Sequence, residues 1–269
     1  MFKKNLTLIL ILIISNFIAA QKSSFIYELK YKTRPDSLII DKINFYLDVN
    51  NGQSVFRSEM FRKSDSLRIK RGFPNGFEIE FNNNQLYTEK NRDTDIILKY
   101  VFVPVVYATF AINIKDNLDW SIDSKKIKIG DYHAQKATTE YGGRIWTAWF
   151  TTDINIPEGP YVFKGLPGLI VKISDDKENF NFELIQIKNF EWEDLHIVKY
   201  QKLITWEDFK KIQKNFYINP YSSLKKGDIL QETSPNKFSE VDLNKATKEL
   251  LEIIRPKYYP LEINHKIDL

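Results

Sequence analysis

Alternating apolar and polar residues run through most of this 269-residue chain and restrict its fold more than any other feature. Four apolar residues of the segment KINFYLDV fall on one side of an extended strand: Ile43, Phe45, Leu47 and Val49. Asn50, Asn51 and Gly52 follow, and these residue types tolerate the positive φ angles of a tight turn. The alternation then resumes in QSVFRSEMFRK, so the sequence predicts an antiparallel hairpin around residues 50–52.

The same pattern recurs in the middle of the chain, where turn residues separate extended segments. The stretch 125–154 is interrupted at Gly130-Asp131 and at Gly142-Gly143. The segments between these breaks have about 9–10 residues, within the usual length of a strand. In RIWTAWF, residues 144–150, both sides of the strand carry apolar residues. This strand is therefore expected to be covered on both sides, or to line a cavity with one of them.

Only near the C-terminus does the period become helical. TWEDFKKIQKNF has Thr205 as the expected N-cap and Asp208 three residues later, and SEVDLNKATKELLEIIRPK is expected to begin at Ser239 and stop at Pro256. Strands followed by helices predict an α+β fold. We expect one large curved antiparallel sheet, similar to a half-barrel, with the two late helices packed on one face, because a long meander twists and curls.

The first 20 residues have the pattern of a secretory signal peptide. Lys3 and Lys4 precede an apolar run over residues 6–14, and Ala20 supplies the small residue of a cleavage site. An uncleaved anchor is the alternative, but the run is shorter than the roughly 20 residues of a transmembrane helix. The chain has no cysteine for a lipid anchor, and no later apolar run is long enough to span a membrane. We expect residues 21–269 to form a single domain that is periplasmic or secreted.

Charge pattern and motifs argue against several classes of function. The net charge of +4 falls to +2 without Lys3 and Lys4, and both signs are interspersed, so no nucleic-acid partner is expected. The sequence has no phosphate-binding glycine loop and no GxSxG, and its three histidines are not at metal-ligand spacing. Glu191, Glu193 and Asp194, which precede His196, supply too few ligands on one strand face for a metal site. We therefore expect no cofactor, no metal and no catalytic residue.

An uncharged run, GLPGLI, lies between two predicted strands and comprises Gly165, Leu166, Pro167, Gly168, Leu169 and Ile170. Pro167 suits position i+1 of a type II turn and Gly168 suits position i+2, because proline presets φ near about −65° and glycine accepts a positive φ. The following residues, LIVKI, form another predicted strand. The run is therefore a structural motif that specifies a turn and carries no reactive group.

The sequence around this run is similar to the GLPGLI family, a group of exported proteins of Gram-negative bacteria. The resemblance extends over residues 132–187 and includes the segments 136–138, 143–149 and 159–161 as well as the run 165–170 itself. It implies export. It implies no activity, because the family has no agreed biochemical function and supplies no catalytic residues.

Aromatic residues make up 14% of the chain, and four of them lie in this stretch: Trp146, Trp149, Tyr161 and Phe163. They suit a ligand-lining wall, because binding sites are concave and largely aromatic, or the core of a large sheet, where such residues are more often found. Our first hypothesis is a non-catalytic envelope protein that binds an apolar or amphipathic ligand, a lipid or a peptide, on the concave face. The second is an interaction module for another envelope protein. The third is a hydrolase that uses His133 with acidic residues.

Overall fold

The protein is described by a computed structural model that covers residues 22–72, 80–106, 108–190 and 195–269. The predicted signal peptide and residues 191–194, with the acidic side chains discussed as metal ligands, lie outside these ranges. In the described part of the chain, twelve strands form one sheet in the order β12-β6-β5-β4-β3-β2-β1-β11-β10-β9-β8-β7. Neighbouring strands are antiparallel except for the short β12–β6 pair.

The strands of this sheet are β1 (Ser23–Lys32), β2 (Ile40–Asn50), β3 (Gln53–Ser58), β4 (Thr88–Asn91), β5 (Ile96–Val103), β6 (Ala108–Ile114), β7 (Ser121–Ile129), β8 (Tyr132–Tyr141), β9 (Arg144–Thr151), β10 (Leu169–Asp175), β11 (Phe180–Asn189) and β12 (Lys202–Leu203). A separate hairpin consists of β13 (Leu230–Ser234) and β14 (Lys237–Glu240). The helices are α2 (Glu59–Arg71), α3 (Trp206–Ile218) and α4 (Leu243–Ile254), with 3-10 turns η2 (Asn83–Gln85), η3 (Arg255–Lys257) and η4 (Ile263–His265).

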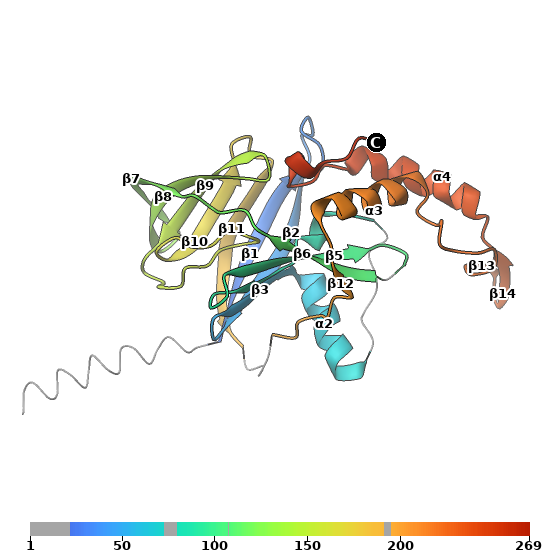
Figure 1. The fold of residues 1–269 in the computed structure, drawn as a ribbon, viewed down its shortest axis with the longest axis horizontal. Helices are drawn as coiled ribbons and strands as arrows, with labels where there is room; N and C mark the ends of the chain where they lie inside the picture. The colour runs from blue at the N-terminus through green and yellow to red at the C-terminus, as the bar shows by residue number, and fades with distance from the viewer. Residues whose placement is uncertain (1–21, 73–79, 107, 191–194) are drawn as a thin grey trace, which may run out of the picture.

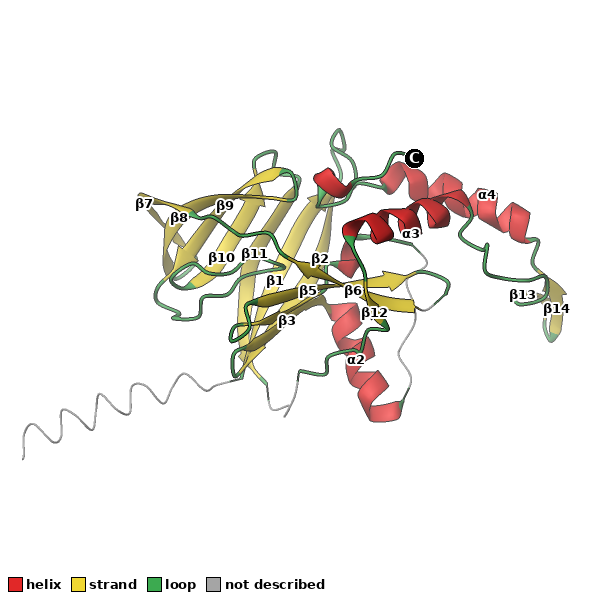
Figure 2. Ribbon diagram, in the orientation of Figure 1, coloured by secondary structure: helices red, strands yellow, loops and turns green. Residues whose placement is uncertain are grey.

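The predicted α+β class is confirmed: the sheet is large, curved and open (Figure 1). The two late helices lie together on one side of β5 and β6, and α2 lies on the other side (Figure 2). The packing agrees with this arrangement. Phe209 of α3 joins the main core with Phe56 and Val101, whereas Phe61 of α2 joins a second core with Tyr87.

Both glycine-containing hairpins that the sequence predicts are present. Asn51 and Gly52 have φ of 45° and 83° between the paired residues Asn50 and Gln53. Gly142 and Gly143 have φ of 64° and 78° and join β8 to β9. Two central residues with positive φ are typical of a type I′ turn, whose twist matches that of the two strands.

The alternation predicts that the strand continues through residues 59–63, but the structure has helix α2 from Glu59 onward. The sequence does contain signals for both helix ends. The Ser58 side chain accepts a hydrogen bond from the Phe61 amide, as N-cap residues do, and Gly72 ends the helix with a φ of 79°. Phe61 then packs on Tyr87 of the sheet at a ring distance of 6.0 Å. Local capping thus ends strand β3 where a continued apolar alternation was expected.

The two late helices differ in how well the sequence predicts their starts. Thr205 and Asp208 form the expected capping box of α3. Helix α4 begins at Leu243 with Asp242 as its N-cap, not at Ser239, because residues 237–240 pair with β13 instead. Helix α4 packs on α3 through a third core cluster of Phe216, Tyr217, Leu250, Ile254 and Ile267.

Arg57 of β3 is a fully buried cation that ties α2 and the segment before β12 to the sheet. Its guanidinium donates to Asp65 at 2.8 Å and to Asp48 at 3.3 Å. It also donates to the backbone carbonyls of Leu195 and His196 at 2.7 and 3.0 Å. Burial raises the pKa of Asp65 to about 6, although the nearby Arg57 charge opposes that shift.

The raised pKa of Asp65 predicts a pH-dependent contribution to stability. Because the folded protein holds this proton more tightly than the unfolded chain, the contribution is complete below pH ~4 and is lost as the pH rises through about 6. The free energy of unfolding should fall by at most about 3 kcal/mol over this range. In Asp65→Asn, the free energy of unfolding measured with urea should not show this fall between pH 4 and 7. Asp36→Asn, at an exposed site, should keep the wild-type profile. A difference between wild type and Asp65→Asn that stays constant with pH would contradict the prediction.

Candidate functional site

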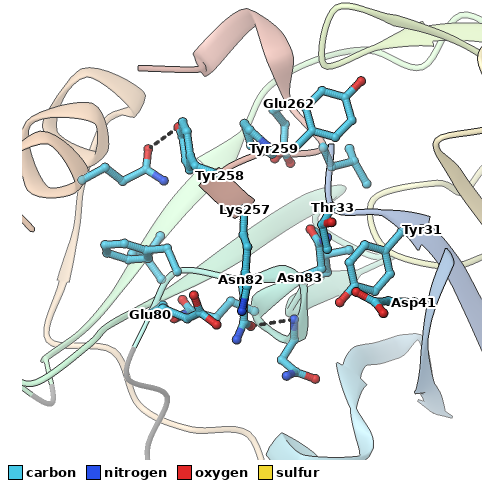
Figure 3. Close-up of a pocket in the computed structure, with 18 of the residues that line it drawn as sticks. Tyr31, Thr33, Asp41, Glu80, Asn82, Asn83, Lys257, Tyr258, Tyr259 and Glu262 are labelled. Atoms are coloured by element: carbon cyan, nitrogen blue, oxygen red, sulfur yellow. Dashed lines mark hydrogen bonds between the residues drawn. The ribbon is translucent and has the colours of Figure 1, made fainter. Parts of the chain in front are cut away.

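A cavity of about 420 Å³ lies where α3, the loop around η2 and the C-terminal segment (residues 257–264) meet strands β1 and β5 (Figure 3). Aromatic rings line it: Tyr31, Phe81, Tyr100, Phe209, Tyr258 and Tyr259. Amide side chains also line it: Asn82, Asn83, Asn84, Gln85 and Gln213. The charged lining residues are Asp41, Glu80, Lys99, Lys257 and Glu262. The cavity can therefore contact both apolar and polar parts of a molecule.

Asn82 and Asn83, the first residues of the asparagine run 82–84, lie on the lower side of the cavity in Figure 3. Asn82 caps η2, because its side-chain oxygen accepts a hydrogen bond from the Asn84 amide at 2.9 Å. Lys257 comes from the opposite wall and reaches across the cavity toward Asn82 (Figure 3). The next wall residue, Gln85, is fixed by donating to the Glu80 carbonyl and accepting from the Phe102 amide.

A polar cluster of four buried side chains lies against the cavity: Lys99, Tyr141, Tyr161 and Glu262. The Lys99 ammonium donates to Tyr161 Oη at 2.7 Å and lies 3.7 Å from Glu262 Oε1. The hydroxyls of Tyr161 and Tyr141 both donate to Glu262 Oε1, the second at 3.3 Å. Lys99 and Glu262 are also part of the cavity wall, so this cluster connects the cavity to the core.

Two nearly buried side chains of the lining keep one hydrogen-bonding group free. Only 5% of Glu262 is exposed, yet its contacts with described residues all go to Oε1, and Oε2 accepts no hydrogen bond from any of them. Gln213, also 5% exposed, accepts from Tyr258 Oη at 3.4 Å, and its amide nitrogen donates to no residue in the described ranges. Neither atom is fully enclosed, so a molecule in the cavity can hydrogen-bond to both.

Burial controls the protonation of the polar cluster. It lowers the pKa of Lys99, and the negative charge of Glu262 opposes that shift. Burial, together with the Glu262 charge, raises the pKa of Tyr141 and Tyr161 well above the ordinary value. Both hydroxyls therefore stay protonated at neutral pH and donate hydrogen bonds to Glu262 Oε1. Oε2 is then the oxygen of this carboxylate that can still accept a hydrogen bond.

Arg144 holds the C-terminal segment in place as one wall of the cavity. Its guanidinium donates to the carbonyls of Leu261 and Pro260 at 2.7 and 3.1 Å, and to the Tyr259 hydroxyl at 3.2 Å. The same group pairs with the buried Asp175 carboxylate at 2.8 Å. A single side chain of β9 thus fixes three successive residues of the segment that carries Glu262.

The Gly142-Gly143 turn lets the C-terminal segment approach the sheet closely. A Cβ at Gly143 would lie 2.9 Å from a side-chain carbon of Ile263 and 3.2 Å from the Asn264 backbone nitrogen. The Asn264 amide donates to the Gly142 carbonyl at 3.3 Å. The turn therefore serves both as a hairpin and as a docking site for the wall of the cavity.

The inner face of the sheet, where the first hypothesis places a ligand, is occupied by the chain itself. Residues 154–169 pack into the main core of the sheet. Polar side chains hold this loop: Thr88 donates to the Tyr161 carbonyl at 2.9 Å, and Lys90 donates to the Gly159 carbonyl at 2.8 Å. Lys90 also pairs with Glu158 at 2.6 Å, and both are almost fully buried. The cavity therefore lies beside this filled face.

The GLPGLI run, Gly165–Ile170, ends this loop, and its turn differs from the expected one. The Gly168 amide donates to the Leu166 carbonyl at 2.7 Å, so the turn closes over Pro167 alone as a γ-turn. A type II turn would use the Leu169 amide, but that amide donates to the Ile154 carbonyl at 3.1 Å. Glycine is still required, because Gly168 has a φ of 145°.

The four aromatic residues singled out for binding take different positions. Trp146 and Phe163 are fully buried and pack on each other at a ring distance of 4.7 Å in the main core. Tyr161 is also fully buried, but its hydroxyl belongs to the polar cluster beside the cavity. Trp149 is half-buried on the other face of β9, where Lys125 lies 5.9 Å from its ring. The structure does not bring the four together as one wall, and their role in binding stays a prediction.

Strand β9 is covered on one face only: Trp146, Ala148 and Phe150 are buried, whereas Ile145 on the other face is 51% exposed. The expected coverage on both sides is therefore wrong, and the alternative, that one face lines a cavity, stays a prediction. The catalytic alternative, His133, is exposed at the start of β8.

The sequence motifs do not identify the residues that line the cavity. Lys99 offers a signal, because a single lysine inside the apolar run DIILKYVFV needs a partner if that strand is buried. Its partner Glu262 lies far along the chain and has no local signal. Among the described residues, no group of three or more His, Asp or Glu side chains could hold a metal ion. Within the same ranges, no helix has the length and apolar character needed to cross a membrane.

Comparison with known proteins gives a short family match and a similar fold. A family described as "Protein of unknown function (Porph_ging)" matches residues 142–172, which include the Gly142-Gly143 turn, Arg144 and the GLPGLI run. The match does not confirm the GLPGLI naming, which stays a prediction. No curated protein matches this sequence.

Two structures of a protein named PNGF-II, in space groups C2 and P21, have a similar fold, with TM-scores of 0.52 and 0.50. Both are 16% identical to this protein over 79% of its chain. The chain spans only 38% and 39% of those structures. At this identity the likeness shows the fold alone.

Proposed function

We propose that this protein is an exported envelope protein that binds an amphipathic ligand, without chemical conversion, in the cavity between α3 and the C-terminal segment. The observation that carries the proposal is the mixed lining of a cavity of about 420 Å³, with aromatic rings beside amide side chains. This volume lies within the roughly 300–1,000 Å³ typical of small-molecule sites. The amides favour an amphipathic ligand such as a peptide over a purely apolar one.

Two further points support a binding role. The cavity has polar groups that are nearly buried and still free to hydrogen-bond, on Glu262 and Gln213. Among the described residues that line it, there is no serine or histidine of the kind that hydrolases use as nucleophile and base. Export rests on the sequence pattern of residues 1–20.

Native mass spectrometry of the mature protein, purified gently from its own envelope fraction, tests the proposal. We expect a bound small mass that denaturation releases. In Asn83→Trp, an indole would project from the half-buried wall into the cavity and lower the bound fraction at least tenfold. The control is Asn113→Trp, the same change at an exposed position of β6, which should leave the bound fraction unchanged. A released mass that Asn83→Trp does not affect would contradict binding in this cavity.

The second candidate, an interaction module, has one observation in its favour. The β13–β14 hairpin pairs only with itself among the described strands, and Phe238 and Leu230 on it are 62% and 55% exposed. An isolated two-stranded hairpin is marginally stable in water. If native mass spectrometry gives a ligand-free mass together with a stoichiometric protein partner, this second candidate replaces the first.

A further inference from the structure

We propose that the polar cluster selects a primary carboxamide on the ligand, as on an asparagine or glutamine side chain or an amidated C-terminus, in preference to a carboxylate or an amine. This inference rests on the proposed function, because it names the chemical group that the same cavity recognises. It is carried by the free oxygen of Glu262 beside the free hydrogens of Lys99.

The cluster presents a hydrogen-bond donor and an acceptor side by side. The Lys99 ammonium has three N–H groups and makes one hydrogen bond to a described residue, to Tyr161. It lies 3.7 Å from Glu262 Oε1, and Oε2 of the same carboxylate accepts nothing from the described residues. Lys99 and Glu262 both line the cavity, so a ligand there can reach the two groups together.

The geometry of a primary carboxamide matches this pair. Its oxygen and one of its N–H groups lie on the same edge of a planar group, so the oxygen can accept from Lys99 while the N–H donates to Glu262 Oε2. A trans peptide bond directs its C=O and N–H in opposite directions and can satisfy only one of the two. The backbone of a peptide ligand is therefore better placed along the amide side chains of the wall.

The charges of the pair argue against an ionised ligand group. Lys99 and Glu262 are almost fully buried and of opposite sign, so together they are close to neutral. A carboxylate would pair with Lys99 but would place a second negative charge against Glu262, and an ammonium would do the reverse against Lys99. Both would also lose their hydration on entering, which is costly when the charge is not fully paired. A neutral group with both a donor and an acceptor has neither cost.

The surrounding groups hold the Glu262 carboxylate in one orientation. Tyr141 and Tyr161 both donate to Oε1 of Glu262, which leaves Oε2 as the acceptor for the ligand. Arg144 fixes the backbone of the residue before Glu262 by donating to the Leu261 carbonyl. The orientation of the carboxylate therefore does not depend on a ligand being present.

The test compares three short probes on the wild-type protein at pH 7 by isothermal titration calorimetry. They are acetyl-phenylalanyl-glutamine N-methylamide and its glutamate and lysine counterparts. We expect the glutamine probe to bind at least tenfold more tightly than either charged probe, because each charged probe leaves one buried group unpaired. A fourth probe, acetyl-phenylalanyl-alanine with a primary amide terminus, distinguishes an amidated C-terminus from a side chain as the source. Equal affinity for the glutamine and glutamate probes would overturn the inference.

Glu262→Gln supplies a readout that a purely structural role of Glu262 cannot produce. The variant keeps an oxygen for Tyr141 and Tyr161 and places an N–H₂ group where Oε2 was. The preference should then invert toward the glutamate probe, since the site now has two donors and a net positive charge. Glu183→Gln, the same change at a half-exposed position of β11, should keep the wild-type preference. An unchanged thermal transition would show that the Glu262→Gln protein is folded. If this folded variant binds neither the glutamine nor the glutamate probe, the inversion is contradicted and with it the inference.

Failure of this inference can be separated from failure of the proposed function. If no probe binds but Asn83→Trp still removes the mass found by native mass spectrometry, the cavity binds a ligand and the carboxamide inference is wrong. If there is neither probe binding nor a bound mass, both are wrong. The probe series on the wild type needs no variant, so the inference remains testable if Glu262→Gln does not fold.

Discussion

Gly168→Ala is expected to lower the free energy of unfolding by more than about 4 kcal/mol, which is exceptional for a single added methyl group. A Cβ at this position would lie 2.0 Å from the Thr151 carbonyl oxygen and 2.7 Å from its carbon. Both are backbone atoms of β9 and cannot rotate away as a flexible side chain could. The φ of 145° adds backbone strain to the clash. The residue therefore keeps the loop at residues 154–169 in contact with the sheet.

The matched control lies in the same motif. Gly165 also has a positive φ, of 90°, but a Cβ there would meet no atom within 4 Å. Gly165→Ala should therefore lower the free energy of unfolding only by the backbone strain, about 1–2 kcal/mol. Urea unfolding of the two variants measures the difference, provided the slope with urea is the same for both. Equal losses at Gly165 and Gly168 would show that close approach to Thr151 is not the reason for glycine.

Arg144→Met is expected to cost about 3–5 kcal/mol, because it leaves a buried charge without its partner. Asp175 is 1% exposed, and its pairing with Arg144 spans 2.8 Å. The substitution also leaves the carbonyls of Pro260 and Leu261 without their donor. We expect the C-terminal segment to detach from β9 in part, so that the protein loses affinity for its cavity ligand as well as stability.

The double variant Arg144→Met with Asp175→Asn separates the effect of the unpaired buried charge from the effect of the lost hydrogen bonds to the C-terminal segment. The substituted amide side chain would still accept from the backbone amides of Asn179 and Phe180, as the Asp175 Oδ1 does, but would carry no charge. Stability should recover in part. Ligand binding should not recover, because the donor to the C-terminal segment is still missing. If binding returns together with stability, Arg144 acts only through the buried ion pair.

Local patterns predict most of the sheet. Strands β8 and β9 and the turn at Gly142-Gly143 follow from alternation and from glycines with positive φ, which depend only on neighbouring residues. Helix α3 follows from Thr205 and Asp208 for the same reason. The predictions failed where two local signals competed. The cap at Ser58 ended a strand that the alternation continued, and the pairing of β14 displaced the start of α4 from Ser239.

The functional residues are a different case, because their role depends on contacts between distant parts of the chain. Glu262 meets Tyr161 and Tyr141, which are 101 and 121 residues away in the sequence. Lys99 lies inside the apolar run DIILKYVFV, but no local pattern says which carboxylate pairs with it. The aromatic residues near the GLPGLI run raised the expectation of a ligand wall, yet Trp146 and Phe163 fill the core and only the hydroxyl of Tyr161 comes close to the cavity.

The sequence by itself determined the α+β class and the hairpins, since these follow from side-chain alternation and allowed backbone angles over a few residues. Only the tertiary structure decided that the chain's own loop fills the inner face of the sheet and that the cavity lies against the C-terminal segment. The physical reason is that burial and charge pairing depend on which distant parts of the chain come into contact in the folded protein. Whether Lys99 faces a carboxylate, a ligand or water depends on where residue 262 lies when the fold closes.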